Sequence, residues 1–212
     1  MLVKGSNIST GVISEISKLI HSRHQKLRVV PNFRVEADYF DIRLGRKVLG
    51  NSAFTISQGE NLSPSIISQF PDTWVTSSKT KPIKPFLDIK YIELLHEKGK
   101  GWARKTMQLL HALSVKSGCE GRMALKTSKK TAGFYSHLGF DCPPKDQEMY
   151  DKLYAIISRI AEVKNLKKRD FAKELRKMDC PTKTNGKYNI DGLRFFEPTE
   201  QNIALLYKTK KS

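Results

Sequence analysis

The stretch PFLDIKYIELLHEKGKGWARKTMQLLHALSVKSG, residues 85–118, decides the fold. Its first part is rich in β-favouring residues and predicts a strand over 86–95. Gly99 and Gly101 then mark a turn. From Trp102 to Val115 the apolar residues recur at helical spacing, and Gly118 is a natural helix end. The sequence therefore predicts a strand, a glycine-rich turn and an amphipathic helix in direct succession.

The glycine-rich turn KGKGWA, residues 98–103, suits a phosphate-bearing ligand. Amides in the first turn of a helix have no intrahelical partners, and the helix dipole adds partial positive charge there. Glycines let the backbone approach an anion closely. The spacing matches neither a P-loop nor a dinucleotide-binding loop. Taken alone the motif is equally typical of a plain turn before a helix; with Lys98, Lys100 and Arg104 around it, it predicts a pyrophosphate cradle.

The rest of the chain alternates predicted strands and helices, which indicates the mixed α/β class. The predicted elements are a helix over 11–24 that ends before Pro31 and Asn32, a hairpin within 34–57, a loop over 58–84 with one short helical turn, a strand over 121–127, a short helix closed by Gly139, helices within 145–178, a turn over 184–189, and final strands over 193–199 and 202–208.

Charge is the strongest feature of the composition. Among 212 residues, 38 Lys and Arg stand against 21 Asp and Glu, which gives a net charge of +17. Such a field attracts nucleic acid, acidic protein surfaces or anionic lipid, although solubility and attraction for a phosphate-rich cofactor also account for it. The chain has no apolar run long enough to span a bilayer and no secretory peptide pattern, so a cytoplasmic protein is expected. Its three widely spaced cysteines predict reduced thiols and no metal site.

About thirty residues after the turn stands FYSHLGF, residues 134–140. The pair KGKGWA and FYSHLGF resembles the two hallmark motifs of the GNAT N-acetyltransferase superfamily, the [QR]-x-x-G-x-[GA] loop and the F-Y-x-x-L-G-F helix. The resemblance covers residues 86–142. It implies a mixed α/β fold with a mostly antiparallel central sheet and splayed central strands. It also implies direct transfer of acetyl from acetyl-CoA to a primary amine.

The resemblance implies a role for each matching residue. Cofactor binding falls to the backbone or side chains of Leu94, Leu95, Lys98, Gly99, Lys100, Gly101, Trp102, Ala103, Arg104 and Ser128. Tyr135 is the expected proton donor, with an aromatic that only packs as the alternative. Glu93 is the expected base, with His96 as the second choice and an exposed strand carboxylate as the plain alternative. The sequence departs from the family at Lys98, where Arg or Gln is usual, at Ser128, where many members carry Asn, and in a short spacing before the loop.

Family members usually pass from the LGF helix to two final strands, but here a helical insertion intervenes. The predicted division is a core over 1–142, a helical insertion over 143–184, and final strands completing the sheet over 185–212. Basic residues are dense between Lys164 and Lys177, which indicates either a solvated face or an acceptor-docking surface.

The acceptor is expected to be a primary amine, with a protein lysine or N-terminus favoured. The alternatives are an acetyltransferase toxin acting on aminoacyl-tRNA and a non-catalytic module that binds acyl-CoA or nucleic acid. RNA or ribosome contact through the basic surface is compatible with each of them.

Overall fold

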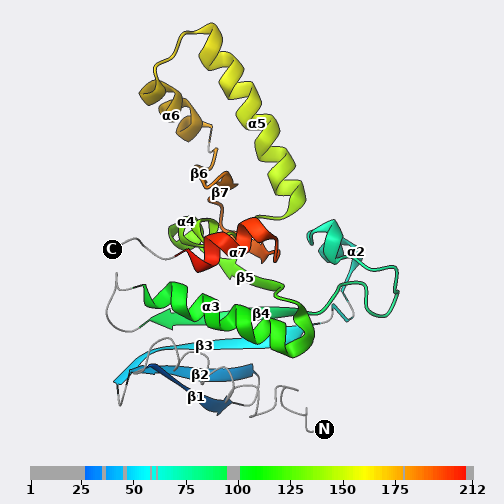
Figure 1. Ribbon diagram of the computed structural model, residues 1–212. Coiled ribbons are helices and arrows are strands. Elements are labelled where there is room, and N and C mark those ends of the chain that lie inside the picture. The colour runs from blue at the N-terminus through cyan, green and yellow to red at the C-terminus, as the bar shows by residue number, and fades with distance from the viewer. Residues whose placement is uncertain are drawn as a thin grey trace.

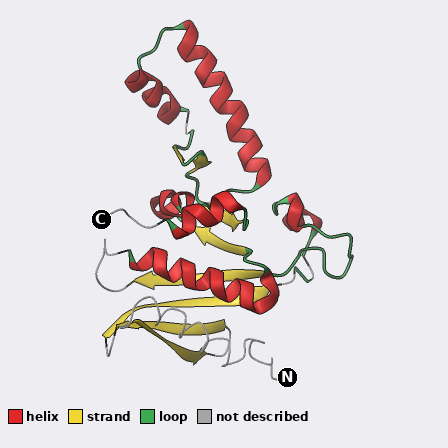
Figure 2. Ribbon diagram, viewed as in Figure 1, coloured by secondary structure: helices red, strands yellow, loops and turns green. Residues whose placement is uncertain are grey.

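The computed structural model describes residues 27–34, 37–44, 47–57, 59–60, 62–94, 101–178 and 180–208. The helix expected over 11–24 lies outside them. Within the described residues, helices and strands alternate around one central sheet (Figures 1 and 2).

The central sheet has six strands in the order β1-β2-β3-β4-β5-β8. They are β1 (Leu27–Arg34), β2 (Ala37–Leu44), β3 (Lys47–Ser57), β4 (Phe86–Leu94), β5 (Met123–Thr127) and β8 (Gly192–Phe196). Every neighbouring pair is antiparallel except β4 and β5, which are parallel. The predicted mixed α/β class with a mostly antiparallel sheet is confirmed.

The N-terminal half of the sheet is partly what the sequence predicts. The hairpin within 34–57 is confirmed as β2 and β3, although its turn at residues 45–46 lies outside the described residues. Strand β1 was not predicted, because Pro31 and Asn32 were interpreted as the end of a helix; both lie inside the strand. Proline removes one backbone donor, and an edge strand such as β1 tolerates that loss.

Two helices cover one face of the sheet. They are α3 (Trp102–Ser114) and α7 (Glu200–Tyr207), and their apolar side chains meet those of the sheet. Leu87 from β4, Met107 and Leu110 from α3, Phe196 from β8 and Leu206 from α7 are all buried in this cluster. A π-helical turn over Val115–Cys119, with Gly118 at φ 79°, ends α3 close to the predicted position.

The opposite face is covered by the segment between β3 and β4. It contains the short helices α2 (Pro64–Ile67) and η1 (Asp72–Trp74). Phe70 and Trp74 from this segment pack on Phe86 of β4 and Phe195 of β8, with ring centroids 5.0 to 5.6 Å apart across the four pairs between these elements. The segment is largely a loop as predicted, but it contains two short helical turns rather than one.

A helical insertion separates β5 and α4 (Lys129–His137) from β8. It contains α5 (Pro144–Val163), α6 (Lys168–Lys177) and a small hairpin of β6 (Lys183–Thr184) and β7 (Lys187–Tyr188). Figure 1 shows α5 and α6 projecting from the sheet as a helical pair. The predicted boundary between residues 184 and 185 falls inside the small hairpin of β6 and β7. The chain returns to the central sheet only at β8.

The second of the two predicted final strands is wrong. Residues 200–207 form the helix α7, and only β8 extends the sheet at this end. The Thr199 side chain accepts a hydrogen bond from the Asn202 amide, which caps the helix. Ile203, Leu206 and Tyr207 then lie on one side of the helix against the core. Across the described residues, the structure contains no helix with the length and apolarity that a bilayer crossing requires.

Candidate functional site

The two central strands, β4 and β5, separate along their length. They pair only at Leu87 with Met123, Asp88 with Ala124, and Ile89 with Leu125. Beyond that point β4 continues to Leu94 on the β3 side, and β5 continues to Thr127 on the β8 side. The predicted splay of the central strands is confirmed. Two diverging strand edges offer backbone donors and acceptors to an extended ligand that lies between them.

A β-bulge occurs in β4 where the splay begins. Ala53 of β3 pairs with Tyr91 and Phe54 pairs with Ile89, so Lys90 is the extra residue. Bulges redirect side chains and are frequent next to active sites. After the bulge, Ile92 packs against the core beneath α3, and Glu93 is exposed. Since successive strand residues point to opposite faces, the Glu93 carboxylate lies on the face away from α3. The Tyr91 hydroxyl donates a hydrogen bond to it.

The N-terminus of α3 is open. Gly101 precedes the helix with φ 77°, and apart from its chain neighbours a Cβ at this position would meet no atom of the described residues within 4 Å. The first intrahelical bond runs from the Lys105 N–H to the Gly101 carbonyl over 3.1 Å, so the amides of residues 102–104 precede it. Such amides at a helix N-terminus fit an anionic group.

The predicted loop is only partly described. Leu95, His96, Lys98, Gly99 and Lys100 lie outside the described residues. Leu94 ends β4 and pairs with Gly50. In Figure 1 the carboxyl end of β4 and the N-terminus of α3 lie at the same end of the sheet.

The Arg104 side chain is engaged by α7, while its place in the phosphate cradle remains a prediction. Its guanidinium donates hydrogen bonds to the carbonyls of Leu205 and Leu206 at the end of α7, at 3.0 Å in the second case. Gln108 donates to the same Leu206 carbonyl at 3.0 Å. Partial burial lowers the pKa of Arg104. With the guanidinium bonded to α7, the group of Arg104 that we propose for the diphosphate is its backbone amide.

Trp102 has a packing role in addition to its place in the loop. Its ring is partly buried against the core cluster. The Lys105 ammonium lies over the ring, 4.4 Å from its centroid, which is cation–π geometry. Ala103 is half-buried on the same turn. The packing of Trp102 against the core cluster anchors the first turn of α3 to the sheet.

Ser128 and Tyr135 lie on the other side of the splay, at the end of β5 and on α4. Ser128 is the exposed N-cap residue of α4, and its hydroxyl lies 3.2 Å from that of Thr131. Tyr135 is half-buried, with its ring centroid 5.7 Å from that of Phe140. Burial raises the pKa of Tyr135 above its ordinary 10.0, so the phenol keeps its proton at neutral pH. A protonated phenol is the state that a proton donor requires.

Arg194 is a residue that the sequence analysis missed. It lies in β8, it is fully buried, and its guanidinium donates to the Tyr188 carbonyl, the Ala132 carbonyl and the Ser136 hydroxyl. Ala132 and Ser136 belong to α4, the helix that carries Tyr135. In the sequence only a single Arg inside the apolar run LRFF hinted at such a role.

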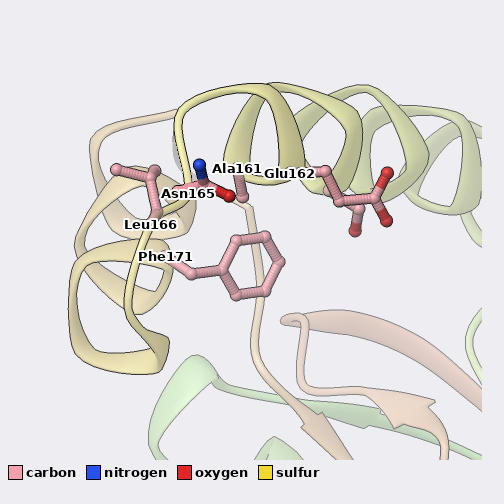
Figure 3. Close-up of a pocket in the computed structure, with 6 residues that line it drawn as sticks. Ala161, Glu162, Asn165, Leu166 and Phe171 are labelled. Atoms are coloured by element: carbon pink, nitrogen blue, oxygen red, sulfur yellow. The ribbon is translucent and has the colours of Figure 1, made fainter.

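An open depression of about 440 Å³ lies where α5 turns into α6 (Figure 3). In Figure 1 this turn lies far from β4 and β5. Its lining comprises Ser158, Ala161, Glu162, Asn165, Leu166 and Phe171. None of the predicted site residues belongs to it. We therefore place the candidate site at the splay rather than at this depression.

The three cysteines, Cys119, Cys142 and Cys180, are all buried. Burial raises the pKa of Cys119 and of Cys142 to about 11, which keeps both as thiols at neutral pH. Among the described residues no cluster of three or more His, Cys, Asp or Glu side chains is arranged to hold a metal ion.

Comparison with solved structures gives distant likenesses, of which two are described here. No protein-family model matches the chain, and no curated protein matches it. A solved structure of AtaTR bound with AcCoA aligns over 58% of this chain and 67% of its own, with a TM-score of 0.33 and 16% identity. Arabidopsis thaliana NAA60 in complex with acetyl-CoA aligns over 57% and 74%, with a TM-score of 0.31 and 12% identity. The TM-scores and sequence identities of both alignments are too low to transfer an activity. The candidate site therefore rests on the strand pairing and contacts described above.

Proposed function

We propose that the chain is an acetyl-CoA-dependent N-acetyltransferase that transfers acetyl directly to a primary amine. The observation that carries the proposal is the divergence of β4 and β5 after Ile89 and Leu125, beside the open N-terminus of α3. A pantetheine arm is an extended chain with two amides, which suits a gap between strand edges. A diphosphate suits the helix amides that follow.

The binding elements are backbone groups for the most part. We assign the pantetheine arm to the edge of β4 up to Leu94 and to the Ser128 hydroxyl at the end of β5. We assign the diphosphate to the backbone at the start of α3, residues 101–104, together with Lys98, Gly99 and Lys100 of the predicted turn, which lie outside the described residues. The open space at Gly101 allows an anion to approach the backbone.

The chemistry requires a base, a proton donor and polarisation of a carbonyl. Acetyl-CoA supplies an activated acetyl group as a thioester. We assign Glu93 as the group that accepts the amine proton, because its carboxylate is exposed next to the splay. We assign Tyr135 as the donor of a proton to the departing CoA thiolate, because it lies on α4, the helix that follows β5 on the other side of the splay, and its phenol is protonated at neutral pH. Backbone amides near the end of β4 would stabilise negative charge on the carbonyl oxygen.

A charge change at Gly101 tests the cofactor assignment. Gly101→Asp places a carboxylate where the diphosphate would lie, and Gly101→Asn is the matched control. Asn has nearly the same shape, no charge, and tolerates the left-handed backbone at φ 77°. Calorimetric titration with acetyl-CoA should show binding at least about tenfold weaker for the Asp variant than for the Asn variant. If both variants bind acetyl-CoA equally, or if ADP binds wild type as tightly as acetyl-CoA, the assignment fails.

For the acceptor we infer an amine on a protein, either a lysine side chain or an N-terminus. The net charge of +17 favours a macromolecule with acidic surface over a small cationic amine. The same charge also favours an amine carried on RNA, such as an aminoacyl-tRNA, as the second candidate. Incubation with labelled acetyl-CoA and lysate fractions, with and without RNase, separates the two. Acetyl label that survives RNase supports a protein acceptor, and label lost with RNase supports the RNA-linked amine. Binding of acetyl-CoA with no thiol release in any fraction would indicate a non-catalytic module and contradict the proposal.

A further inference from the structure

Helix α5 exposes a stripe of large apolar side chains along most of its length. Met149, Ile156, Ile160 and Val163 are all exposed, and Val163 is 81% exposed. At about 100° per residue these positions fall within an arc of roughly 60° on one side of the helix. We call this set the α5 stripe. Single apolar residues scattered over a surface need no explanation, but four exposed apolar residues along one face of a helix indicate an interaction site.

The α5 stripe is distinct from the side of α5 that packs inside the protein. Ile157 is buried and packs with Leu175 and Cys180 of the α6 region, and Tyr154 and Phe171 complete this contact. The helical pair thus already has its own small core. The α5 stripe lies on another side of the same helix, on the part of the molecule that projects from the sheet in Figure 1.

Basic residues border the α5 stripe in a regular row. Lys145, Lys152 and Arg159 recur every seven residues along α5, so they follow one line on the helix surface. Lys152 also pairs with Glu148 at 2.6 Å, with both side chains exposed, and such exposed pairs contribute little. A partner that covers the apolar stripe would therefore meet positive charge along its edge.

We propose that the α5 stripe docks an amphipathic helix of a partner protein whose apolar residues are flanked by Asp and Glu. Successive residues of the stripe are seven, four and three positions apart. This spacing is typical of the side chains with which one helix packs against another. Charge complementarity selects the acidic partner. A second copy of this chain fits poorly, because each copy carries a net charge of +17 and would bring the same basic row. RNA would meet the basic row but gain nothing from the aliphatic side chains. The proposal does not depend on the acetyltransferase assignment.

The test uses the full chain and a labelled peptide as the probe. The peptide has the length of α5, which is 20 residues, with Leu at helical intervals flanked by Glu. One control peptide has the same composition in scrambled order, and a second has Lys in place of Glu. Fluorescence anisotropy should show the amphipathic Glu peptide binding at least about tenfold more tightly than either control, with affinity falling as salt rises. Equal binding of the scrambled peptide would mean attraction by charge alone and would overturn the proposal.

Paired variants locate the contact. Val163→Ser and Ile156→Ser should each weaken peptide binding about tenfold. Val115→Ser is the matched control, because Val115 is also an exposed aliphatic residue but lies at the end of α3. Arg159→Gln should weaken binding, and Lys79→Gln in the exposed segment before β4 should not. Circular dichroism checks that each variant folds, which is expected because the replaced side chains are exposed. Two outcomes overturn the proposal: equal binding by Val163→Ser and Val115→Ser, or a dimer in sedimentation velocity that Val163→Ser converts to a monomer, which would make a second copy the occupant.

Discussion

The Arg194 guanidinium on β8 donates a hydrogen bond to the Ser136 hydroxyl on α4, and both side chains are fully buried. The same guanidinium also binds the Tyr188 carbonyl at the end of the insertion. One side chain therefore joins the sheet, the helix that carries Tyr135 and the inserted hairpin. Nη2 joins β8 to α4 and Nη1 joins β8 to the hairpin, whereas the buried Nε has no hydrogen-bond partner among the described residues.

Ser136→Ala removes one acceptor from this buried guanidinium. We expect the free energy of unfolding to fall by about 1–3 kcal/mol, because a charged donor is left without its partner. Urea denaturation measures the change. Ser77→Ala, at an exposed position before β4, is the control and should change stability by less than about 0.5 kcal/mol. Equal stability of the two variants would show that the Ser136 contact contributes nothing.

Arg104→Gln separates a structural role from a cofactor-binding one. The guanidinium binds the last carbonyls of α7, so its loss should lower the free energy of unfolding by about 1–2 kcal/mol. The affinity for acetyl-CoA should change by less than about twofold, because the side chain is engaged away from the proposed diphosphate position. Urea denaturation and calorimetry report the two quantities. The reverse result, weaker binding with unchanged stability, would mean that the guanidinium leaves α7 for the phosphate.

Tyr135→Phe tests the proposed proton donor. Removing the hydroxyl should lower kcat by about a hundredfold or more while the Kd for acetyl-CoA stays the same. Tyr154→Phe, on the insertion, is the matched control and should leave kcat unchanged. If Tyr135→Phe turns over like wild type, Tyr135 only packs.

The pH profile gives an independent check on Tyr135. A proton donor works while protonated, so activity is lost as pH rises through its pKa. The ordinary pKa of a tyrosine is 10.0, and burial raises the pKa of Tyr135 above it. The loss of kcat at alkaline pH that is due to Tyr135 should therefore occur above pH 10.0. The limb should vanish in Tyr135→Phe. A limb that persists unchanged in the variant belongs to another group.

Glu93→Gln tests the proposed base. The amide keeps the shape of the side chain and the contact with Tyr91, but it cannot take up a proton. We expect kcat to fall by about a hundredfold, with acetyl-CoA binding retained. Glu60→Gln, at an exposed position after β3, serves as the control. Turnover equal to that of the control would remove Glu93 from the chemistry and leave His96, outside the described residues, as the predicted alternative.

Gly139 has one role that the local sequence predicts and another that it does not. The sequence predicted that it ends a helix, and it does so at φ 102° directly after α4. The structure adds a second reason for glycine here, since a Cβ would lie 3.1 Å from the Asn202 backbone of α7. No local pattern predicts that approach, because α7 lies some sixty residues further along the chain.

By itself the sequence determined the strand before the glycine-rich turn, the helix after it, the hairpin of β2 and β3, and the mixed α/β class. Each follows from apolar period, turn residues and helix ends, which are local properties of the chain. Tertiary structure alone decided that β1 forms an edge strand across Pro31, that residues 200–207 become a helix over the core, that Arg104 turns to α7, and that Arg194 is buried against α4. In each of these cases the outcome depends on partners distant in sequence, whose packing and hydrogen bonds outweigh the propensity of the local segment.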